Sequence, residues 1–325
     1  MIFHFNWIWL FLAVLFAGFA LVFIGNKKKN LNILQWGYLL AIASCFVLLS
    51  VLKDFTISMF FLVFVTGACW VIERYIFNQK KWRPKKSWLA KHFVRYSGEF
   101  FPILLIVFLL RSFVVEPFQI PSSSMRPGLV PGDFIMVNKF TYGLRLPILN
   151  HVVMPLHEIA RGDVVVFNAP MNENINFIKR IIGLPGDTVT YQDKVLLING
   201  KQIPKIPAES YVYPTDDSKK LQYNQQFVEQ MNNKSFKTLN DPSMLSVYLG
   251  AIQPHPYLKS CHYEKNGRAF VCKVPLNCYF VMGDNRDGSN DSRYWGFVKS
   301  DLIVGKAFMI WMNFKAFERI GTIIE

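Results

Sequence analysis

Four long apolar runs occupy the first third of the chain, at residues 7–24, 33–52, 55–72 and 100–115. A helix of about 17 to 25 mainly apolar residues crosses a bilayer core, and each run reaches or nearly reaches that length. Charged clusters lie at the ends of the runs, which argues against buried helices of a soluble protein. The pattern predicts four transmembrane helices. The fourth is the shortest and carries Arg111 near its end, where a long side chain can reach the interface.

Residues 116–325 have a different pattern, in which short β-rich runs alternate with Pro, Gly and Asp turns. Examples are DFIMVNKF, DVVVFNAP and IVGKAFMIWM, and no long amphipathic helical pattern interrupts them. We therefore expect a mainly β domain, arranged as a compact barrel or coiled sheet. Residues 211–258, rich in Asn, Gln, Ser and Lys, predict an inserted subdomain or long loops. The expected division is an anchor at 1–98, a last span at 99–115 and the β domain at 116–325.

The net charge of +14 changes the picture mainly through its location. Residues 1–98 hold 12 Lys and Arg against 2 Asp and Glu, whereas residues 99–325 hold 24 against 20. The excess therefore flanks the apolar runs, no basic stripe remains for nucleic acid, and the expected partner is the lipid bilayer. Basic loops after the first and third runs stay in the cytoplasm, which puts the N-terminus and residues 116–325 outside the cytoplasmic membrane. A first run removed as a signal sequence is the alternative, but it is long for that purpose and no basic segment precedes it.

Five cysteines are present, and Cys45 and Cys69 fall inside apolar runs. Cys261 and Cys272 flank a segment whose Asn-Gly pair at 266–267 predicts a two-residue hairpin turn. That register sets the two cysteines opposite each other, which makes them disulfide candidates in an oxidising compartment. It also makes them a hydrogen-bonded pair, whose side chains lie farther apart, which counts against the bond. Cys278 is left over. A metal site built on the three would need a fourth ligand, and only His262 is near, so we expect no metal and no other cofactor.

Four polar segments remain, and each has an ordinary structural interpretation when taken alone. PSSSMRPGLVPGD at 121–133 could be a linker, RGDVVVF at 161–167 a turn and buried strand, and GDNRDGSNDSRYWGF at 283–297 a solvated loop. In FIKRIIGLPGD, at 177–187, strand alternation places Lys179 on one face with Phe177 and Ile181. A lysine among such neighbours is a candidate for desolvation.

Taken together and in this order, the four segments resemble those of the bacterial type I signal peptidases, also called leader peptidases, which use a Ser/Lys dyad. Two departures are Ser123, where the family often has Gly, and more spans than the usual anchor. The resemblance implies that Ser124 is the nucleophile and Lys179 its base. It implies an oxyanion hole made by the Ser122 hydroxyl and the Ser124 N–H, and a lysine amine oriented by Ser289.

The resemblance also implies a supporting charge network and a specificity pocket. The network residues are Asp291, Arg293, Asp284 and Arg286. The pocket walls, which would admit only small residues before the cut, are Phe118, Ile120, Pro121, Met125, Leu129 and Ile178. The expected substrates are secretory preproteins, cut after a small-x-small motif.

Competing functions fit the sequence less well. A Ser-His-Asp hydrolase could draw on His151, His157, His255 and His262, but none lies in the four segments and no G-x-S-x-G elbow occurs. A penicillin-recognising enzyme needs Lys three residues after Ser, and no lysine follows these serines at that spacing. A self-cleaving repressor-type protease would not need four spans. A catalytically silent membrane-tethered binding or chaperone protein with the same fold would be expected to lack Ser124 or Lys179.

Overall fold

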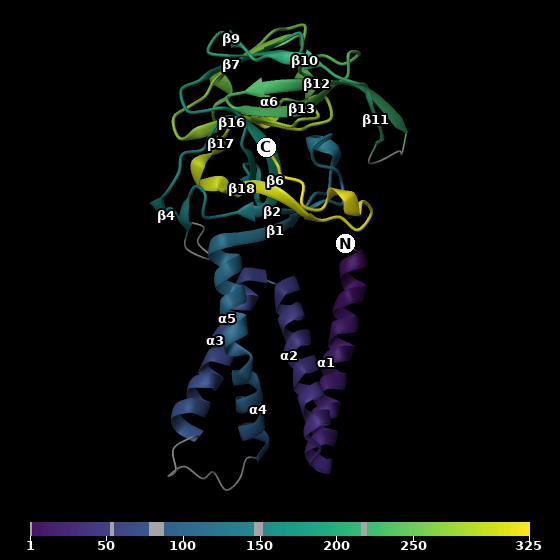
Figure 1. The fold of residues 1–325 in the computed structure, drawn as a ribbon, viewed down its shortest axis with the longest axis vertical. Helices are drawn as coiled ribbons and strands as arrows, with labels where there is room; N and C mark the ends of the chain where they lie inside the picture. Colours follow the sequence, from purple (N-terminus) through teal and green to yellow (C-terminus); the bar gives the residue numbers. More distant parts are fainter. Residues whose placement is uncertain (1, 53–54, 78–87, 146–151, 216–219) are drawn as a thin grey trace. The chain divides into compact units, whose positions relative to one another are not determined.

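The computed structural model describes residues 2–52, 55–77, 88–145, 152–215 and 220–325. It divides into two compact units, Met1–Ser112 and Phe113–Glu325. The loop at 53–54, the basic residues at 80–86 and His151 lie outside the described residues. The prediction of four apolar helices followed by a mainly β domain is confirmed (Figure 1).

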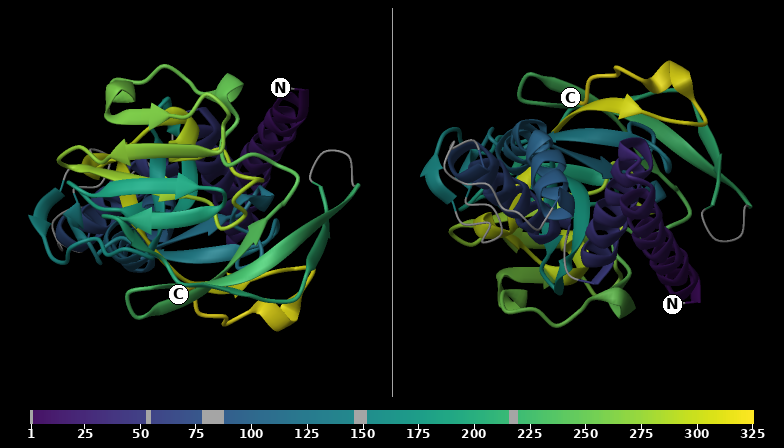
Figure 2. Two further views of the ribbon diagram at one scale, coloured as in Figure 1. Left: turned by 90° about the horizontal axis from the view of Figure 1, so that it is seen from above. Right: turned by 90° about the horizontal axis from the view of Figure 1, so that it is seen from below.

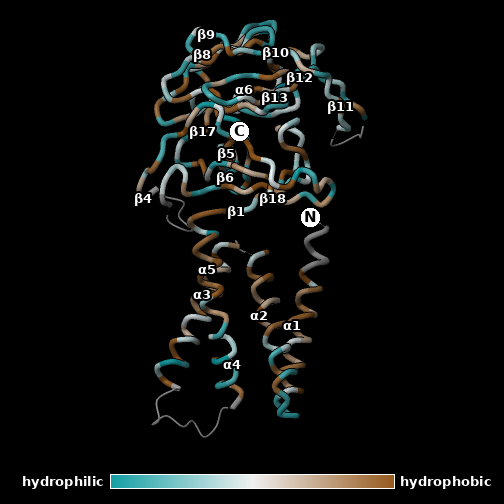
Figure 3. The backbone as a smooth tube through the Cα atoms, viewed as in Figure 1, coloured by the Kyte–Doolittle hydropathy of each residue, from teal (hydrophilic) through white to brown (hydrophobic). Residues whose placement is uncertain are grey.

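The first unit is helical. Its α-helices are α1 Ile2–Lys28, α2 Leu31–Leu52, α3 Phe55–Val71, α4 Trp88–Glu99 and α5 Phe101–Leu109, and π-helical turns follow at η1 Ile72–Phe77 and η2 Leu110–Val114. Four helical stretches are long and apolar enough to cross a membrane: Ile8–Lys28, Leu31–Val51, Phe55–Ile76 and Leu89–Val114. Figure 3 shows hydrophobic residues along most of their length.

The fourth stretch begins at Leu89 and not near residue 100 as the apolar run suggested. Helix α4 is amphipathic, and its polar residues, including Lys91 and Arg95, hide the helix from a search for continuous apolar residues. Pro102 stands in the first turn of α5, where a residue without an N–H is tolerated. The span is therefore an amphipathic helix followed by an apolar one.

Helices α1 and α2 approach closely because glycine lies at their contact. A Cβ added to Gly37 would lie 2.7 Å from the Val22 backbone nitrogen and 2.9 Å from the Gly18 carbonyl oxygen. Such contacts between small residues are typical of helices that pack within a bilayer. We expect this pair to form one tight hairpin.

The second unit consists of antiparallel sheets. A seven-stranded sheet has the order β1-β2-β18-β5-β6-β16-β17, a five-stranded sheet the order β14-β15-β7-β8-β9, a four-stranded sheet pairs β12 with β10, β11 and β13, and β3 pairs with β4 (Figure 1). The strands are β1 Val115–Gln119, β2 Phe134–Asn138, β3 Gly143–Arg145, β4 Val152–Pro155, β5 Val164–Ala169, β6 Asn172–Gly183, β7 Thr188–Gln192, β8 Val195–Ile198, β9 Lys201–Gln202, β10 Lys205–Pro207, β11 Tyr211–Pro214, β12 Leu221–Met231, β13 Lys234–Asn240, β14 Cys261–Tyr263, β15 Ala269–Lys273, β16 Cys278–Met282, β17 Val298–Lys299 and β18 Ile303–Met312.

The seven-stranded sheet is covered on both faces. Along β5, Val164 and Val166 belong to one buried apolar cluster, whereas Val165 and Phe167 belong to another. Successive residues of a strand point to opposite faces, so an unbroken apolar run such as VVVF reports two buried faces. Strand β6 lies beside β5 and is buried from Ile178 to Gly183, which desolvates Lys179 and Arg180.

Cys261 and Cys272 are joined by a disulfide, and Cys278 is free and buried. The register is the expected one, but the prediction of a hydrogen-bonded pair is wrong. The hairpin closes with the Glu264 N–H donating to the Ala269 carbonyl at 2.9 Å, which makes the loop four residues long. Pair types alternate along a ladder, so the cysteines form a non-hydrogen-bonded pair, with Cα atoms 4.0 Å apart.

The stretch 211–258 contains strands β11, β12 and β13. In both views of Figure 2 the yellow C-terminal segment lies beside the green strands of this region. Glu209, Tyr211 and Gln226 accordingly line the same cavity as residues 322–325. This arrangement brings the stretch toward the segment that contains Ser124.

Candidate active site

Ser124 lies in one 3-10 turn, Ser123–Met125, that follows strand β1. The loop that carries this turn is closed at its base. The Ile120 N–H donates to the Asp133 carbonyl at 2.8 Å, and the Gly132 N–H donates to the Ile120 carbonyl at 2.9 Å. Ser124 is 8% exposed. The hydroxyl is therefore held in a short, anchored loop and largely shielded from water.

Lys179 comes from β6, where it pairs with Val165 of β5. Its Nζ lies 2.8 Å from Ser124 Oγ and donates to the Ile178 carbonyl at 2.9 Å. Ser122 Oγ lies 3.4 Å from Ser124 Oγ. The fold thus brings Lys179 to the two serines, although it lies 55 residues after Ser124 in the chain.

Burial lowers the pKa of Lys179 from 10.5 to about 8, because desolvation disfavours the ammonium form. Asp291 and Asp284 act in the opposite direction by stabilising the positive charge, and Arg293 adds to the lowering. The Phe177 ring centre lies 5.6 Å from Nζ. At pH 7 roughly a tenth of such a lysine is neutral, far more than in a lysine of ordinary pKa.

This pKa predicts the pH dependence of any reaction in which the Lys179 amine accepts the Ser124 proton. Only the neutral amine of Lys179 can accept the Ser124 proton, so kcat/KM is expected to rise about tenfold per pH unit up to about pH 8 and then to level off. A second lysine could give the same pH profile and has to be tested. Burial and nearby Arg286 lower the pKa of Lys205 to about 8 as well, and its amine bonds to Asn240 Oδ1 at 2.6 Å. Lys205→Met is expected to keep the same rising limb. Loss of the rising limb in Lys205→Met would show that the limb reports the titration of Lys205 and not of Lys179.

The segment 283–297 is organised by a buried ion pair. Arg293 Nε and Nη2 donate to the two Asp291 oxygens at 2.8 and 2.9 Å, and neither side chain is exposed. Asp291 also accepts the Gly283 N–H at 3.0 Å and precedes the short helix α6 Ser292–Trp295. The pair therefore ties the two ends of the loop together.

Asp284 and Arg286 do not pair with each other. Asp284 accepts two bonds from Arg180, at 2.8 and 2.7 Å, and Arg286 Nη2 donates to Glu229 at 2.5 Å. Sequence reasoning missed both partners. Arg180 follows Lys179 in an apolar strand, and an arginine buried there needs an acidic partner. The position of Arg180 could therefore have predicted an ion pair with a distant acid. Glu229 stands among polar residues of β12, where the sequence offered no such signal.

Ser289 is buried beside Gly283. A Cβ added to Gly283 would lie 2.4 Å from Ser289 Oγ and 2.5 Å from the Ser124 carbonyl oxygen. Only a glycine therefore lets the loop and the nucleophile turn approach this closely. Among the described residues no hydrogen bond joins Ser289 to Lys179. The orienting role of Ser289 stays a prediction.

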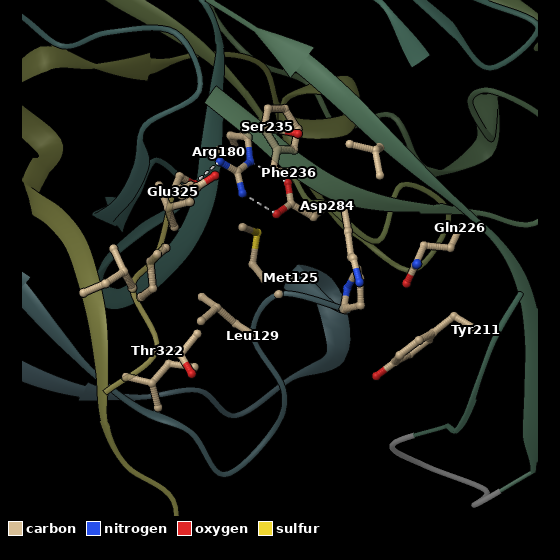
Figure 4. Close-up of a pocket in the computed structure, with 18 of the residues that line it drawn as sticks. Met125, Leu129, Arg180, Tyr211, Gln226, Ser235, Phe236, Asp284, Thr322 and Glu325 are labelled. Carbon is tan, nitrogen blue, oxygen red and sulfur yellow. Dashed lines mark hydrogen bonds and ion pairs between the residues drawn. The ribbon is translucent and has the colours of Figure 1, made fainter. Parts of the chain in front are cut away.

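The residues expected to wall the specificity pocket gather in one apolar cluster, except for Pro121, which is exposed. The cluster contains Phe118, Ile120, Met125, Leu129 and Ile178. Met125 and Leu129 also line a cavity of about 650 Å³, shown in Figure 4 with the Arg180–Asp284 pair at its wall. Ser124 and Lys179 are not among the residues that line this cavity.

Four apolar helices and a β domain that holds a serine hydroxyl against a buried lysine define a membrane-anchored serine peptidase. The sequence model of the signal peptidase family, peptidase S26, matches residues 93–312, more than half of the chain. The chain belongs to the signal peptidase family.

Two sequence relatives agree with this membership. A signal peptidase I of Pseudomonas fluorescens is 41% identical over 249 residues, which cover 71% of this chain and 79% of the relative. A signal peptidase I of Buchnera aphidicola subsp. Baizongia pistaciae is 36% identical over 298 residues, which cover 80% and 95%. A crystal structure of a signal peptidase I from Enterococcus faecalis is 29% identical and covers 46% of this chain and 97% of that one, with a TM-score of 0.26.

Proposed function

We propose that the chain cleaves N-terminal signal peptides from secreted preproteins after a small-x-small motif, with Ser124 as nucleophile and Lys179 as general base. The observation that carries the proposal is the 2.8 Å contact between the Ser124 hydroxyl and a lysine amine whose pKa is lowered by burial. Relatives named signal peptidase I, aligned over most of both chains, support it. A silent scaffold would have no need of this contact.

The chemistry follows from the placement of the amine. Neutral Lys179 takes the proton of the Ser124 hydroxyl as Oγ attacks the carbonyl carbon of the residue before the cut. The new oxyanion is stabilised by the Ser124 N–H and the Ser122 hydroxyl. The ammonium then protonates the leaving amine, and an ester to Ser124 remains. Water, deprotonated by the same lysine, hydrolyses the ester and restores the enzyme.

Specificity is attributed to the apolar cluster beside the turn. Met125, Ile120 and Leu129 are 1 to 2% exposed and packed in one cluster, so they do not readily move aside for a bulky substrate side chain. A preprotein with Ala at the last position before the cut is expected to be cleaved roughly a hundredfold faster than one with Phe there. Purified chain in detergent, with release of mature protein measured, tests this. Equal rates for the two substrates would contradict the pocket assignment.

We further propose that the chain lies in the bacterial cytoplasmic membrane with its N-terminus and β domain outside. Supports are Lys27 and Lys28 at the end of α1, Lys91 and Arg95 on α4, and a disulfide in the β domain. Protease added to spheroplasts is expected to degrade the β domain and to spare a tag inserted at residues 80–86. A tag cleaved from outside would reverse the orientation.

A further inference from the structure

Strand β11, which lies outside the four polar segments singled out in the sequence, contacts the segment that carries Ser124. The Tyr211 hydroxyl accepts a hydrogen bond from Arg126 Nη1 at 3.1 Å, and Arg126 Nε donates to Ser123 Oγ at 3.0 Å. The Arg126 guanidinium also lies 4.7 Å from the centre of the Tyr213 ring. Both tyrosines therefore contact a residue immediately after the nucleophile turn.

Asn285 completes the connection. Its backbone N–H donates to the Ser124 carbonyl at 3.1 Å, and its Nδ2 donates to the Ser123 carbonyl at 3.1 Å and to the Tyr213 hydroxyl at 2.7 Å. Asn285 is 0% exposed and Tyr213 is 4% exposed, so water competes little for these bonds. We call the set Tyr211, Tyr213, Arg126 and Asn285 the tyrosine clamp.

One side of the turn borders a cavity. Met125, Pro127 and Gly128 border the cavity of about 650 Å³, and Tyr211 lies across it (Figure 4). A side chain at a cavity wall has fewer packed neighbours to resist displacement than one in a filled core. The hydrogen bonds of the tyrosine clamp therefore add restraint to the turn on the side that borders the cavity.

We infer that Tyr213 and Asn285 are positioning residues for peptide-bond cleavage, a role that rests on the proposed function of Ser124. Asn285 holds the Ser123 and Ser124 carbonyls, and Tyr213 holds the Asn285 amide. Together they set the direction of the Ser124 N–H and of Oγ toward Lys179. A displacement of about 1 Å in such a group costs on the order of a hundredfold in rate. They act through the turn, since Asn285 bonds to both carbonyls and the Tyr213 hydroxyl accepts from Asn285. The Tyr213 hydroxyl also donates to Gln222 Oε1 at 3.4 Å, away from the turn.

Tyr213→Phe tests the inference, because it removes one hydroxyl and keeps the ring beside Arg126. For preprotein cleavage, kcat per folded molecule is expected to fall roughly fivefold, the effect of one hydrogen bond, with KM unchanged. Tyr223→Phe is the matched control: Tyr223 lies on the neighbouring strand β12, is 68% exposed, and its variant is expected to keep the wild-type kcat. A wild-type kcat in Tyr213→Phe would overturn the inference.

A second arm tests the hydrogen bond itself. In an Asn285→Ala background, Tyr213→Phe is expected to change kcat little further, because the bond between the two residues is already absent. An undiminished fivefold fall in that background would also overturn the inference. Failure of the proposed function has a different signature, since Ser124→Ala would then cleave as fast as wild type. Failure of the positioning role leaves Ser124→Ala inactive and Tyr213→Phe fully active.

Discussion

Ser124→Ala and Lys179→Ala are each expected to lower kcat for preprotein cleavage by roughly four to six orders of magnitude, the range seen when a nucleophile or its base is removed. The reason is geometric, because the two groups lie 2.8 Å apart and both are buried. Without the amine no group takes the serine proton, and without the hydroxyl no ester forms. Release of mature protein is followed on gels, at an enzyme concentration high enough for the residual cleavage rate of both variants to be detected.

Two further variants sharpen this prediction. Lys179→Arg keeps a positive charge but not a base, since the guanidinium stays protonated, and it is expected to be as inactive as Lys179→Ala. Joint replacement of the histidines of the soluble half is expected to leave cleavage within a few-fold of wild type; they are His151, His157, His255 and His262. Normal cleavage by Lys179→Ala would show that the dyad is wrong. Loss of cleavage in the histidine variant would favour the Ser-His-Asp alternative.

Asp291→Ala is expected to destabilise the β domain by about 3 to 5 kcal/mol, because it leaves the Arg293 guanidinium buried without its carboxylate. That is a large share of the about 5 to 15 kcal/mol that stabilises an ordinary domain. Desolvation tends to raise the Asp291 pKa, but Arg293 and the Gly283 N–H hold it below its usual value. The pair's contribution is therefore complete above the ordinary carboxyl pKa and disappears only as the pH falls through the lowered one. Urea unfolding at pH 7 measures the change.

The same ion pair is expected to matter for catalysis through loop geometry and not through its charge alone. A double variant, Asp291→Leu with Arg293→Met, is expected to regain much of the lost stability, because an apolar pair leaves no buried charge unpaired. It is not expected to regain cleavage, since the Gly283 N–H still lacks its acceptor. Glu264→Ala, an exposed acid in the cysteine hairpin, is the control and is expected to change neither quantity. Recovery of full activity in the double variant would contradict this view of the loop.

Much of the fold could be predicted because it depends on local periodicity. Continuous apolar runs identified α1, α2 and α3, and alternation with turn residues identified the β domain. The start of the last span was missed because α4 is amphipathic, and amphipathic helices do not form apolar runs. The hairpin register placed Cys261 opposite Cys272, but the loop length, and with it the type of pair, depended on the Glu264–Ala269 bond.

Partners far apart in the chain escaped prediction. The sequence placed Asp284 and Arg286 in one loop and suggested local support, whereas their carboxylate and guanidinium bond to Arg180 and Glu229. The hydrogen bond between Tyr213 and Asn285, part of the tyrosine clamp, likewise joins β11 to a loop 72 residues away. Such pairings depend on which strands become neighbours, and single-residue patterns carry no record of that choice.

By itself, the sequence determined the membrane anchor, the β character of the second unit and, through the resemblance, the identity of the Ser124 and Lys179 candidates. These follow from composition, periodicity and short motifs. The tertiary structure alone decided that Lys179 is buried and lies against Ser124. Its pKa is lowered by neighbours that several strands contribute, and the sequence does not show which strands become neighbours. It also decided that 211–258 contacts the loop beside Ser124, since Tyr213 bonds to Asn285 and Glu229 to Arg286 only once β11 and β12 have folded against that loop.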